Sequence, residues 1–442
     1  MRQIEDFLAA HARQSPEQTA LVCGDSRLTY RQLYDRVQQQ ARQLAEEGAG
    51  PYVPLRAACS VDFLVSYLGV HRAGLVAVPL EADLPTEQWQ QLQHRLQQAP
   101  APPAGTADVL FTTGTTGRQK GVVVGHEALV ADAENLAAAQ GYAPGLTFLL
   151  HGALSHIGSL SKVYPVLLTG GTLHLLPGGL RDMAAFFAAA ENAPGRVATF
   201  MVPATLRMLL TFAAGRLEAA AARFDFIETG AAPLPEADMQ RLCRLLPHTR
   251  LYNTYASTET GIIATHNYAG GQCRAGLLGA PMRHSSLRIS AEGTVECGGK
   301  TLMTGYFCDP EATARVLQGG WLHTADLGRL DPQGRLLLQG RRDCVINAGG
   351  YKVNPEEVEE AALATGLVTD SLCVPAPHPV LGTVLRLLAV VPGGALDKKQ
   401  LALALRQRLP AYKVPAQYEA VAEIPRTFNG KKDRKKGAEM QR

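Results

Sequence analysis

The densest group of chemically useful side chains lies between Leu110 and Gly121. This run contains four threonines, three glycines and one lysine, Lys120. Glycines free the backbone to curl around an anion, threonine hydroxyls and backbone N–H groups donate hydrogen bonds, and the lysine supplies positive charge. The run therefore predicts a polyphosphate-binding loop. Its spacing differs from a Walker A loop, which needs glycine directly before the lysine, and from the dinucleotide-binding G-x-G-x-x-G fingerprint.

From Thr112 to Gly121 the run resembles the signature loop of the adenylate-forming superfamily. This superfamily includes acyl- and aryl-coenzyme A ligases, peptide-synthetase adenylation domains and firefly-type luciferases. Its pattern is [ST]-[ST]-G-[ST]-T-G-x-P-K-G, and the sequence departs from it only at Gln119, where proline is usual. Other motifs of the superfamily follow in order along almost the whole chain. The resemblance implies that ATP and Mg²⁺ are used to activate a carboxylic acid.

A second motif, Tyr255–Glu259, resembles Y-G-x-T-E, with Ala256 in place of glycine. The resemblance implies that Tyr255 stacks on adenine, that Thr258 contacts the α-phosphate and that Glu259 holds Mg²⁺. The last role agrees with the preference of a hard cation for carboxylate oxygen.

The segment Glu228–Pro235 resembles S-G-G-A-P-L, which borders the adenine and acyl pockets of the superfamily. By this resemblance Gly230 lies beside the acid, and Ala231 and Ala232 lie beside ATP. Small residues there let the backbone approach a flat base.

The ribose and the hinge between domains correspond to two later motifs. Residues 320–328 resemble G-W-x-x-T-G-D-x-G, with alanine for the second glycine, and imply that Asp326 accepts hydrogen bonds from the ribose hydroxyls. Residues 340–353 resemble G-R-x-D-x-x-I-K-x-x-G and imply that Arg341 joins Asp326 on the ribose. In this motif Asp343 corresponds to the hinge. The last residues of the motif imply a thiol tunnel, which includes Gly349 and Gly350.

Near the end of the sequence, Pro425–Arg434 resembles P-x-T-x-x-G-K-x-D-R, which puts the catalytic lysine at Lys431. Taken alone, the basic run 431–436 is typical of a solvated tail, and only the preceding motif residues favour catalysis. Both reacting partners are anionic, so catalysis needs positive charge where negative charge builds up. The resemblance assigns Lys431 to the carboxylate and α-phosphate, and Lys120 to the leaving pyrophosphate. The full set of expected ATP contacts is Thr112, Thr113, Gly114, Thr115, Thr116, Gly117, Lys120, Ala231, Ala232, Tyr255, Thr258, Asp326 and Arg341.

The acid is constrained by the segment Leu154–Gly158, which resembles the F-H-x-x-G of coenzyme A ligases and aryl-acid activators. The resemblance implies that His156 lies at the acyl pocket together with Gly230, although a structural histidine packed in a loop is the alternative. Activators of amino acids usually carry Phe-Asp in this region, and no Asp lies between His151 and Lys162. A free fatty or aromatic acid is therefore favoured.

Coenzyme A is the expected thiol acceptor, and phosphopantetheine on a carrier protein is the alternative. In that case the chain is a stand-alone adenylation enzyme of natural-product assembly. A third alternative, a degenerate non-catalytic binding protein, is suggested by the departures at Gln119, Ala256, Ala325 and Asn347. Against it, Lys120, Glu259, Asp326, Arg341 and Lys431 are all present.

Composition excludes several other classes of protein. The 442 residues carry a formal charge of only +3, and aromatic residues make up 6%, which argues against a nucleic-acid binder. The eight cysteines form no C-x-x-C pair, which predicts reduced thiols in a cytoplasmic protein. No apolar stretch is long enough to predict a membrane span. The oligomeric state stays open.

Hydrophobic patterning predicts the elements that position these motifs. Helical spacing at 28–48 and 63–70 is followed by an apolar strand at 73–80, and such alternation continues to about residue 285. This pattern predicts an α/β protein with doubly wound sheets, followed by a small β-barrel-like part. We expect a large ATP- and acid-binding domain over 1–341 and a small, mobile C-terminal α+β domain over 342–442. Relative to the superfamily, 84–106 is shortened to a Gln-rich helix and a Pro-Ala linker.

Overall fold

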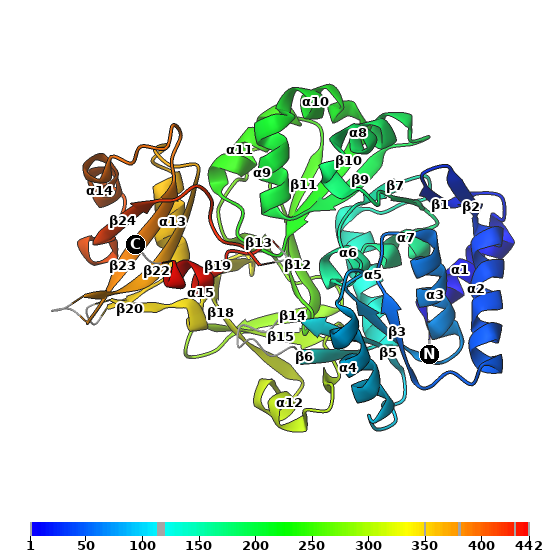
Figure 1. Ribbon diagram of the computed structural model, residues 1–442. Helices are drawn as coiled ribbons and strands as arrows, with labels where there is room; N and C mark the ends of the chain where they lie inside the picture. The colour runs from blue at the N-terminus through cyan, green and yellow to red at the C-terminus, as the bar shows by residue number, and fades with distance from the viewer. Residues whose placement is uncertain (1, 113–119, 349–350, 379–381, 428–429, 441–442) are drawn as a thin grey trace.

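A computed structural model describes residues 2–112, 120–348, 351–378, 382–427 and 430–440. Two α/β sheets and a curved antiparallel sheet form a large N-terminal domain, and a small α+β domain follows (Figure 1). This architecture confirms the predicted fold class.

The largest sheet has eight strands in the order β12-β11-β10-β9-β7-β8-β1-β2. Neighbouring strands from β11 to β1 run parallel, and β12 and β2 add antiparallel edges. Successive apolar side chains of each strand point to opposite faces of the sheet, so that both faces are buried in hydrophobic cores, as expected of a central parallel sheet. The strands are β1 (Thr19–Cys23), β2 (Ser26–Thr29), β7 (Thr147–Leu150), β8 (Thr172–Leu175), β9 (Val197–Met201), β10 (Phe224–Gly230), β11 (Arg250–Ser257) and β12 (Gly261–Asn267).

Helices cover both faces of this sheet. One group of helices lies between one face of this sheet and one face of the second sheet. It comprises α1 (Ile4–Gln14), α2 (Tyr30–Glu46), α3 (Val61–Arg72), α5 (His126–Gln140), α6 (Ile157–Leu160) and α7 (Val163–Thr169). The other face carries α8 (Met183–Asn192), α9 (Pro203–Phe212), α10 (Ala214–Ala219) and α11 (Glu236–Leu245), with the 3₁₀ turns η1 (Gly179–Arg181) and η2 (Ala221–Arg223).

The second sheet has the order β16-β6-β5-β4-β3. Its strands are β3 (Tyr52–Arg56), β4 (Val76–Leu80), β5 (Thr106–Thr112), β6 (Lys120–Gly125) and β16 (Gly305–Tyr306). The Gln-rich helix α4 (Thr86–Gln97) buries Leu92 and Leu96 against this sheet, and the Pro-Ala linker after it is not helical. The motif at 112–121 was predicted to lead into a helix at His126. The helix does begin there, but β6 intervenes because Val122, Val123 and Val124 favour a strand.

The third sheet has the order β13-β19-β18-β15-β14, with β17 paired to β18, which confirms the barrel-like part. Its elements are β13 (Leu277–Gly279), β14 (Ser285–Ile289), β15 (Thr294–Gly299), α12 (Pro310–Val316), β17 (Leu317–Gln318), β18 (Trp321–Leu330) and β19 (Leu336–Arg341).

The small domain packs two helices on one face of a three-stranded sheet, β22-β23-β24, and α15 on the other. Its elements are η3 (Arg342–Cys344), β20 (Ile346–Ala348), β21 (Tyr351–Val353), α13 (Pro355–Leu363), β22 (Asp370–His378), β23 (Gly382–Val390), α14 (Lys398–Arg406), η4 (Ala411–Lys413), β24 (Gln417–Ala420) and α15 (Arg434–Glu439).

A buried polar network joins α1, α3 and β5 beneath the two α/β sheets. His71 Nδ1 lies 3.0 Å from Glu5 Oε1, and His71 Nε2 lies 3.0 Å from Asp108 Oδ1. Tyr67 donates to Asp108 at 2.9 Å and lies 2.9 Å from the hydroxyl of Tyr164. One positively charged imidazole thus bridges two buried carboxylates that come from distant parts of the sequence.

The last two features of the fold concern membrane-spanning helices and disulfides. Within the described ranges, no helix combines the length and the apolar character needed to cross a membrane. All eight cysteines lie in those ranges, and none of them is part of a disulfide in the structure.

Candidate functional site

The phosphate-loop motif connects β5 and β6, which pair as an antiparallel hairpin. Thr112 and Lys120 face each other across the strands, and the Thr112 hydroxyl donates to the Lys120 carbonyl at 3.4 Å. The predicted contacts Thr113, Gly114, Thr115, Thr116 and Gly117 lie outside the described residues. The motif therefore joins two strands at its described ends, and the first turn of α5 lies a whole strand away.

The predicted adenine and ribose residues come together where β11 meets the third sheet. The Tyr255 hydroxyl donates to Asp326 Oδ2 at 2.6 Å, and Arg341 Nη1 donates to Asp326 Oδ1 at 3.2 Å. Asp326 and Arg341 are cross-strand neighbours on β18 and β19, so the sheet register sets their contact. Burial and the Asp326 carboxylate raise the pKa of Tyr255, which keeps its hydroxyl a donor.

Glu259 lies in the turn between β11 and β12 and is half-buried. Its Oε1 accepts a hydrogen bond from the Tyr306 hydroxyl at 3.2 Å, and Lys120 Nζ lies 4.8 Å from the centre of the Tyr306 ring. Tyr306 therefore links the metal candidate to the phosphate-loop lysine. Sequence reasoning assigned Tyr306 no role; its only signal was its position at the end of the segment before the ribose motif.

Lys431 lies in the small domain, directly before Lys432, which forms an isolated β-bridge with Arg426. The Thr427 amide donates to the Lys431 carbonyl at 2.8 Å. A β-carbon built on Gly430 would lie 3.9 Å from side chains of both Val202 and Ala204 in the large domain. The backbone next to the predicted catalytic lysine therefore lies close to the large domain.

The charges around Lys431 are those of the predicted ATP site. The pKa of Lys431 is lowered overall. Loss of solvation and the Arg341 cation lower it, whereas the carboxylates of Asp326 and Glu259 oppose this shift. The side chain nevertheless stays exposed to the space between the domains. Charged residues from three separate motifs therefore act electrostatically on the Lys431 ammonium, which comes from a fourth motif.

A buried carboxylate on α13 holds the segment that carries Lys431. Glu359 is 4% exposed and accepts from Lys432 Nζ at 2.6 Å, from Arg434 and from the Cys373 amide at 2.8 Å. The basic run is therefore not a solvated tail, because two of its cations are paired inside the small domain. This pairing fixes the residue that follows Lys431.

Replacing Glu359 with glutamine should release this segment, because Lys432 and Arg434 would lose their shared buried anion. We expect a loss of about 3 kcal/mol in small-domain stability. Hydrogen exchange of residues 430–440 should become faster, and pyrophosphate exchange slower. The exposed Glu439→Gln on the same segment is the matched control. Unchanged protection of 430–440 in Glu359→Gln would contradict this role.

One cluster of ion pairs joins the two domains beside the segment that carries Lys431. Arg207 on α9 pairs with Asp238 at 3.0 Å within the large domain and lies 3.6 Å from Asp370 of the small domain. Asp370 also pairs with Arg426, and lies 3.8 Å from Lys432. Asp370 is thus shared by cations from both domains.

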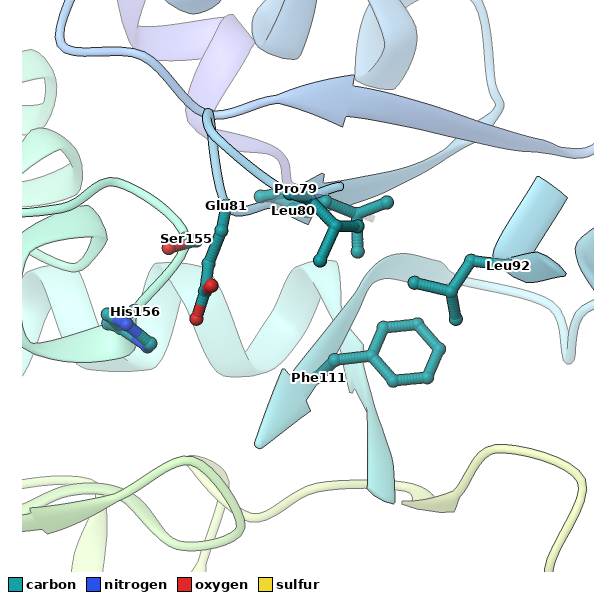
Figure 2. Close-up of a pocket in the computed structure, with 8 residues that line it drawn as sticks. Pro79, Leu80, Glu81, Leu92, Phe111, Ser155 and His156 are labelled. Carbon is teal, nitrogen blue, oxygen red and sulfur yellow. The ribbon is translucent and has the colours of Figure 1, made fainter. Parts of the chain in front are cut away.

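One of the predicted acid-pocket residues, His156, lies in a pocket of the large domain. His156 lines a small pocket that also contains Ser155 and the apolar side chains Leu92 and Phe111, with Glu81 extending toward His156 (Figure 2). Burial lowers the pKa of His156, and the Lys431 charge lowers it further. Both effects favour the neutral form of the imidazole, and the second shows that the Lys431 charge acts on His156 across the domain boundary.

Replacing Lys431 with methionine should raise the pKa of His156, because removing a nearby cation stabilises the imidazolium. Burial remains, so the pKa should stay below the ordinary value of about 6.5. A histidine titration followed by NMR would measure the shift. An unchanged pKa of His156 would mean that the two side chains do not approach each other in solution.

The other predicted residues are placed as follows. Ala232 and Thr258 are half-buried, and Ala231 is exposed with a left-handed φ of 69°. That conformation favours glycine, so an alanine there stores backbone strain at the site. Asp343 lies in η3, directly after β19, and Gly349 and Gly350 lie outside the described residues. Gly230 ends β10, and a β-carbon on it would lie 3.0 Å from the Thr254 carbonyl.

The chain is similar to known proteins over almost its whole length. The sequence pattern of the family described as AMP-binding enzyme matches residues 8–99 and 87–307, and that of its C-terminal domain matches 357–431. A 3-[(3aS,4S,7aS)-7a-methyl-1,5-dioxo-octahydro-1H-inden-4-yl]propanoyl:CoA ligase of Mycobacterium tuberculosis is 28% identical, over 98% of this chain and 97% of that protein. A D-alanine–D-alanyl carrier protein ligase of Bacillus cytotoxicus is 26% identical over 99% and 98%.

A solved structure shares the same fold over nearly its whole length. It is the O-succinylbenzoate coenzyme A synthetase of Bacillus subtilis in complex with ATP and magnesium ion, with a TM-score of 0.84 and 23% identity, covering 97% of this chain and 98% of that one. The chain therefore belongs to the AMP-binding enzymes, the adenylate-forming superfamily that includes the AMP-forming acid–coenzyme A ligases.

Proposed function

We propose that this enzyme uses ATP to activate a free carboxylic acid, fatty or aromatic, and transfers the acyl group to coenzyme A. The observation that carries the proposal is the convergence of Lys431 with Glu259, Asp326 and Arg341, next to neutral His156. These charges come from separate motifs and two domains, yet they act on one accessible ammonium.

The first half-reaction joins two anions. A carboxylate oxygen of the acid attacks the α-phosphorus, the bond from that phosphorus to the bridging oxygen breaks, and pyrophosphate leaves. Lys431 neutralises charge on the carboxylate and α-phosphate, and Lys120 neutralises charge on the departing pyrophosphate. Asp326 and Arg341 orient the ribose, with Tyr255 beside the adenine.

The second half-reaction consumes the acyl-adenylate. The thiol sulfur attacks the acyl carbon, the carbon–oxygen bond to AMP breaks, and the thiol proton passes to solvent. Lys431 is not needed for this step, so the small domain can turn about Asp343 and bring the 349–350 region to the thiol. We place the domain boundary at 341–342. The shortened segment 84–106 contributes Leu84 and Leu92 to the pocket lined by His156.

The donor set at Glu259 fits Mg²⁺, because a half-buried carboxylate supplies the hard oxygen that this ion prefers. Mg²⁺ bound there would neutralise charge on the phosphates of ATP. Tyr306 orients the carboxylate through its hydrogen bond to Oε1.

A second acceptor is supported by the similarity to a D-alanyl carrier protein ligase. In that alternative the acyl group passes to phosphopantetheine on a carrier protein. Incubation with acid and ATP, offering either coenzyme A or a phosphopantetheinylated carrier, separates the two acceptors by the thioester that forms.

Acid-dependent exchange between ATP and pyrophosphate tests the proposal itself. A screen across fatty, aromatic and amino acids should give exchange with one of the first two groups. Exchange with amino acids alone would overturn the substrate class. A folded protein that supports no exchange with any acid would favour a non-catalytic binding role.

A further inference from the structure

An ion pair to which the superfamily motifs assign no role is buried close to Gly230, one of the predicted acid-pocket residues. Lys162, directly before α7, lies with Nζ 2.8 Å from Oε1 of Glu228 on β10, and the two side chains are 1% and 0% exposed. Removing two charges from water costs several kcal/mol for each ion, and their attraction often only offsets that penalty. A buried pair at this position therefore needs a reason other than stability.

The pair is also incompletely satisfied. Glu228 Oε2 is buried without a hydrogen-bond partner. The Lys162 ammonium has three donors, but within the described ranges only Glu228 Oε1 accepts from it, while Nζ also lies 4.9 Å from the centre of the Phe200 ring. The pair therefore offers both a donor and an acceptor to a further group.

The Phe200 side chain lies between this ion pair and the predicted acid pocket. Phe200 and Glu228 are cross-strand neighbours on β9 and β10, so their side chains share one face of the sheet. A β-carbon on Gly158 would lie 3.1 Å from Cε1 of the ring, and one on Gly230 would lie 3.5 Å from Cε2. The half-buried ring thus has Gly158 and the predicted acid-pocket residue Gly230 at its edge and the Lys162 ammonium over its face.

The charge state of the pair decides what kind of group fits. Lysine and glutamate neutralise each other, so a second carboxylate would place two anions beside one cation. A methyl group would leave the donor and the acceptor unpaired, at a penalty of about 1–3 kcal/mol for each group. A hydroxyl accepts from Lys162 and donates to Glu228, which satisfies both.

We propose that Lys162 and Glu228 form the polar end of the acid pocket, and that the substrate is a carboxylic acid with a hydroxyl remote from its reacting carboxylate. The Phe200 ring turns aside to admit the chain of this acid. This inference rests on the proposed function and narrows it from fatty or aromatic acids in general to hydroxylated ones.

The test is pyrophosphate exchange with acids that share one skeleton and differ only in the remote group: hydroxyl, oxo, carboxylate or methyl. Aliphatic and phenyl skeletons form separate arms. We expect kcat/KM to be at least about 100-fold higher for the hydroxyl than for the methyl compound, because a site built to hydrogen-bond a hydroxyl rejects the analogue lacking it. The oxo compound should fall between them, and the carboxylate should be excluded.

The double variant Lys162→Met/Glu228→Leu removes the charges together and leaves no unpaired ion. The ratio of kcat/KM for the hydroxyl compound to kcat/KM for the methyl compound should fall toward one, mainly because the KM for the hydroxyl compound rises. The matched control is Arg250→Met/Asp225→Leu, a part-exposed pair in which Asp225 lies on β10, the strand of Glu228, and Arg250 lies on the neighbouring strand β11; this variant should keep the preference. The hydroxy acid should also raise the melting temperature of the wild type but not of the Lys162/Glu228 double variant.

The outcomes separate this inference from the proposed function. Exchange with acids but no preference for the hydroxyl, or the same preference in the double variant, would overturn the inference alone. Absence of exchange with every acid would overturn the proposed function. If the double variant does not fold, the wild-type series decides by itself.

Discussion

Replacing Lys431 with alanine should abolish acyl-adenylate formation while leaving thioester formation from preformed acyl-adenylate in place. The loss in acid-dependent pyrophosphate exchange should be at least about 10²–10³-fold, the usual effect of removing a preorganised charge at a transition state. Lys431 faces Asp326, Glu259 and Arg341 from an accessible position, so it can neutralise an incoming carboxylate and phosphate. Both half-reactions can be followed separately by exchange and by release of AMP.

Lys435→Ala is the matched control for this substitution, because Lys435 is an exposed lysine of the same segment. It should retain full exchange. Survival of exchange in Lys431→Ala would show that the lysine has been assigned wrongly. Loss of both half-reactions in Lys431→Ala would instead show that the substitution damages the small domain.

Replacing His71 with leucine should lower the free energy of unfolding of the large domain by about 3–5 kcal/mol, the usual consequence of removing one partner of a buried ion pair. Without the imidazolium, the carboxylates of Glu5 and Asp108 would be buried without their shared cation. Denaturation by urea, followed by fluorescence and calorimetry, measures the change. His248→Gln, an exposed histidine of the same domain, is the control.

The same residue should make stability depend on pH. Burial lowers the pKa of His71, but Glu5 and Asp108 together raise it, to about 10 against 6.5 in an unfolded chain. The folded state therefore holds this proton more tightly. Its stabilising contribution is complete below about pH 6.5 and is lost as the pH rises toward 10. Parallel stability curves for the wild type and His71→Leu over that interval would contradict the network.

Much of the fold follows from local patterning. Residues 63–70 gave a helix and 147–150 a strand because their apolar spacing, and the glycines around them, agree with the packed structure. The linker 99–105 was recognisable because proline cannot continue a helix. β6 was missed because its apolar run, Val122 to Val124, is short and lies between the glycine-rich motif and the helix that begins at His126.

Some features of the candidate site were predictable from sequence motifs, and others were not. Asp326 and Arg341 were identifiable from motifs, and the register of β18 and β19 explains why two motifs act together. The pairing of Lys162 with Glu228, 66 positions apart, was not predictable because nothing local connects them. Each is a charged residue inside an apolar segment, which was the only available signal. The network around His71 was missed for the same reason.

The shared carboxylate of Asp370 bears on how easily the two domains can separate. If Arg207 moves away, it still holds Asp238, and Asp370 still holds Arg426 and Lys432. No charge is stranded on either surface, so the contact can be broken and remade without the penalty that an orphaned ion would impose. If the small domain turns as proposed, breaking this contact therefore costs little electrostatic free energy, and the two orientations proposed for the successive half-reactions can be close in free energy.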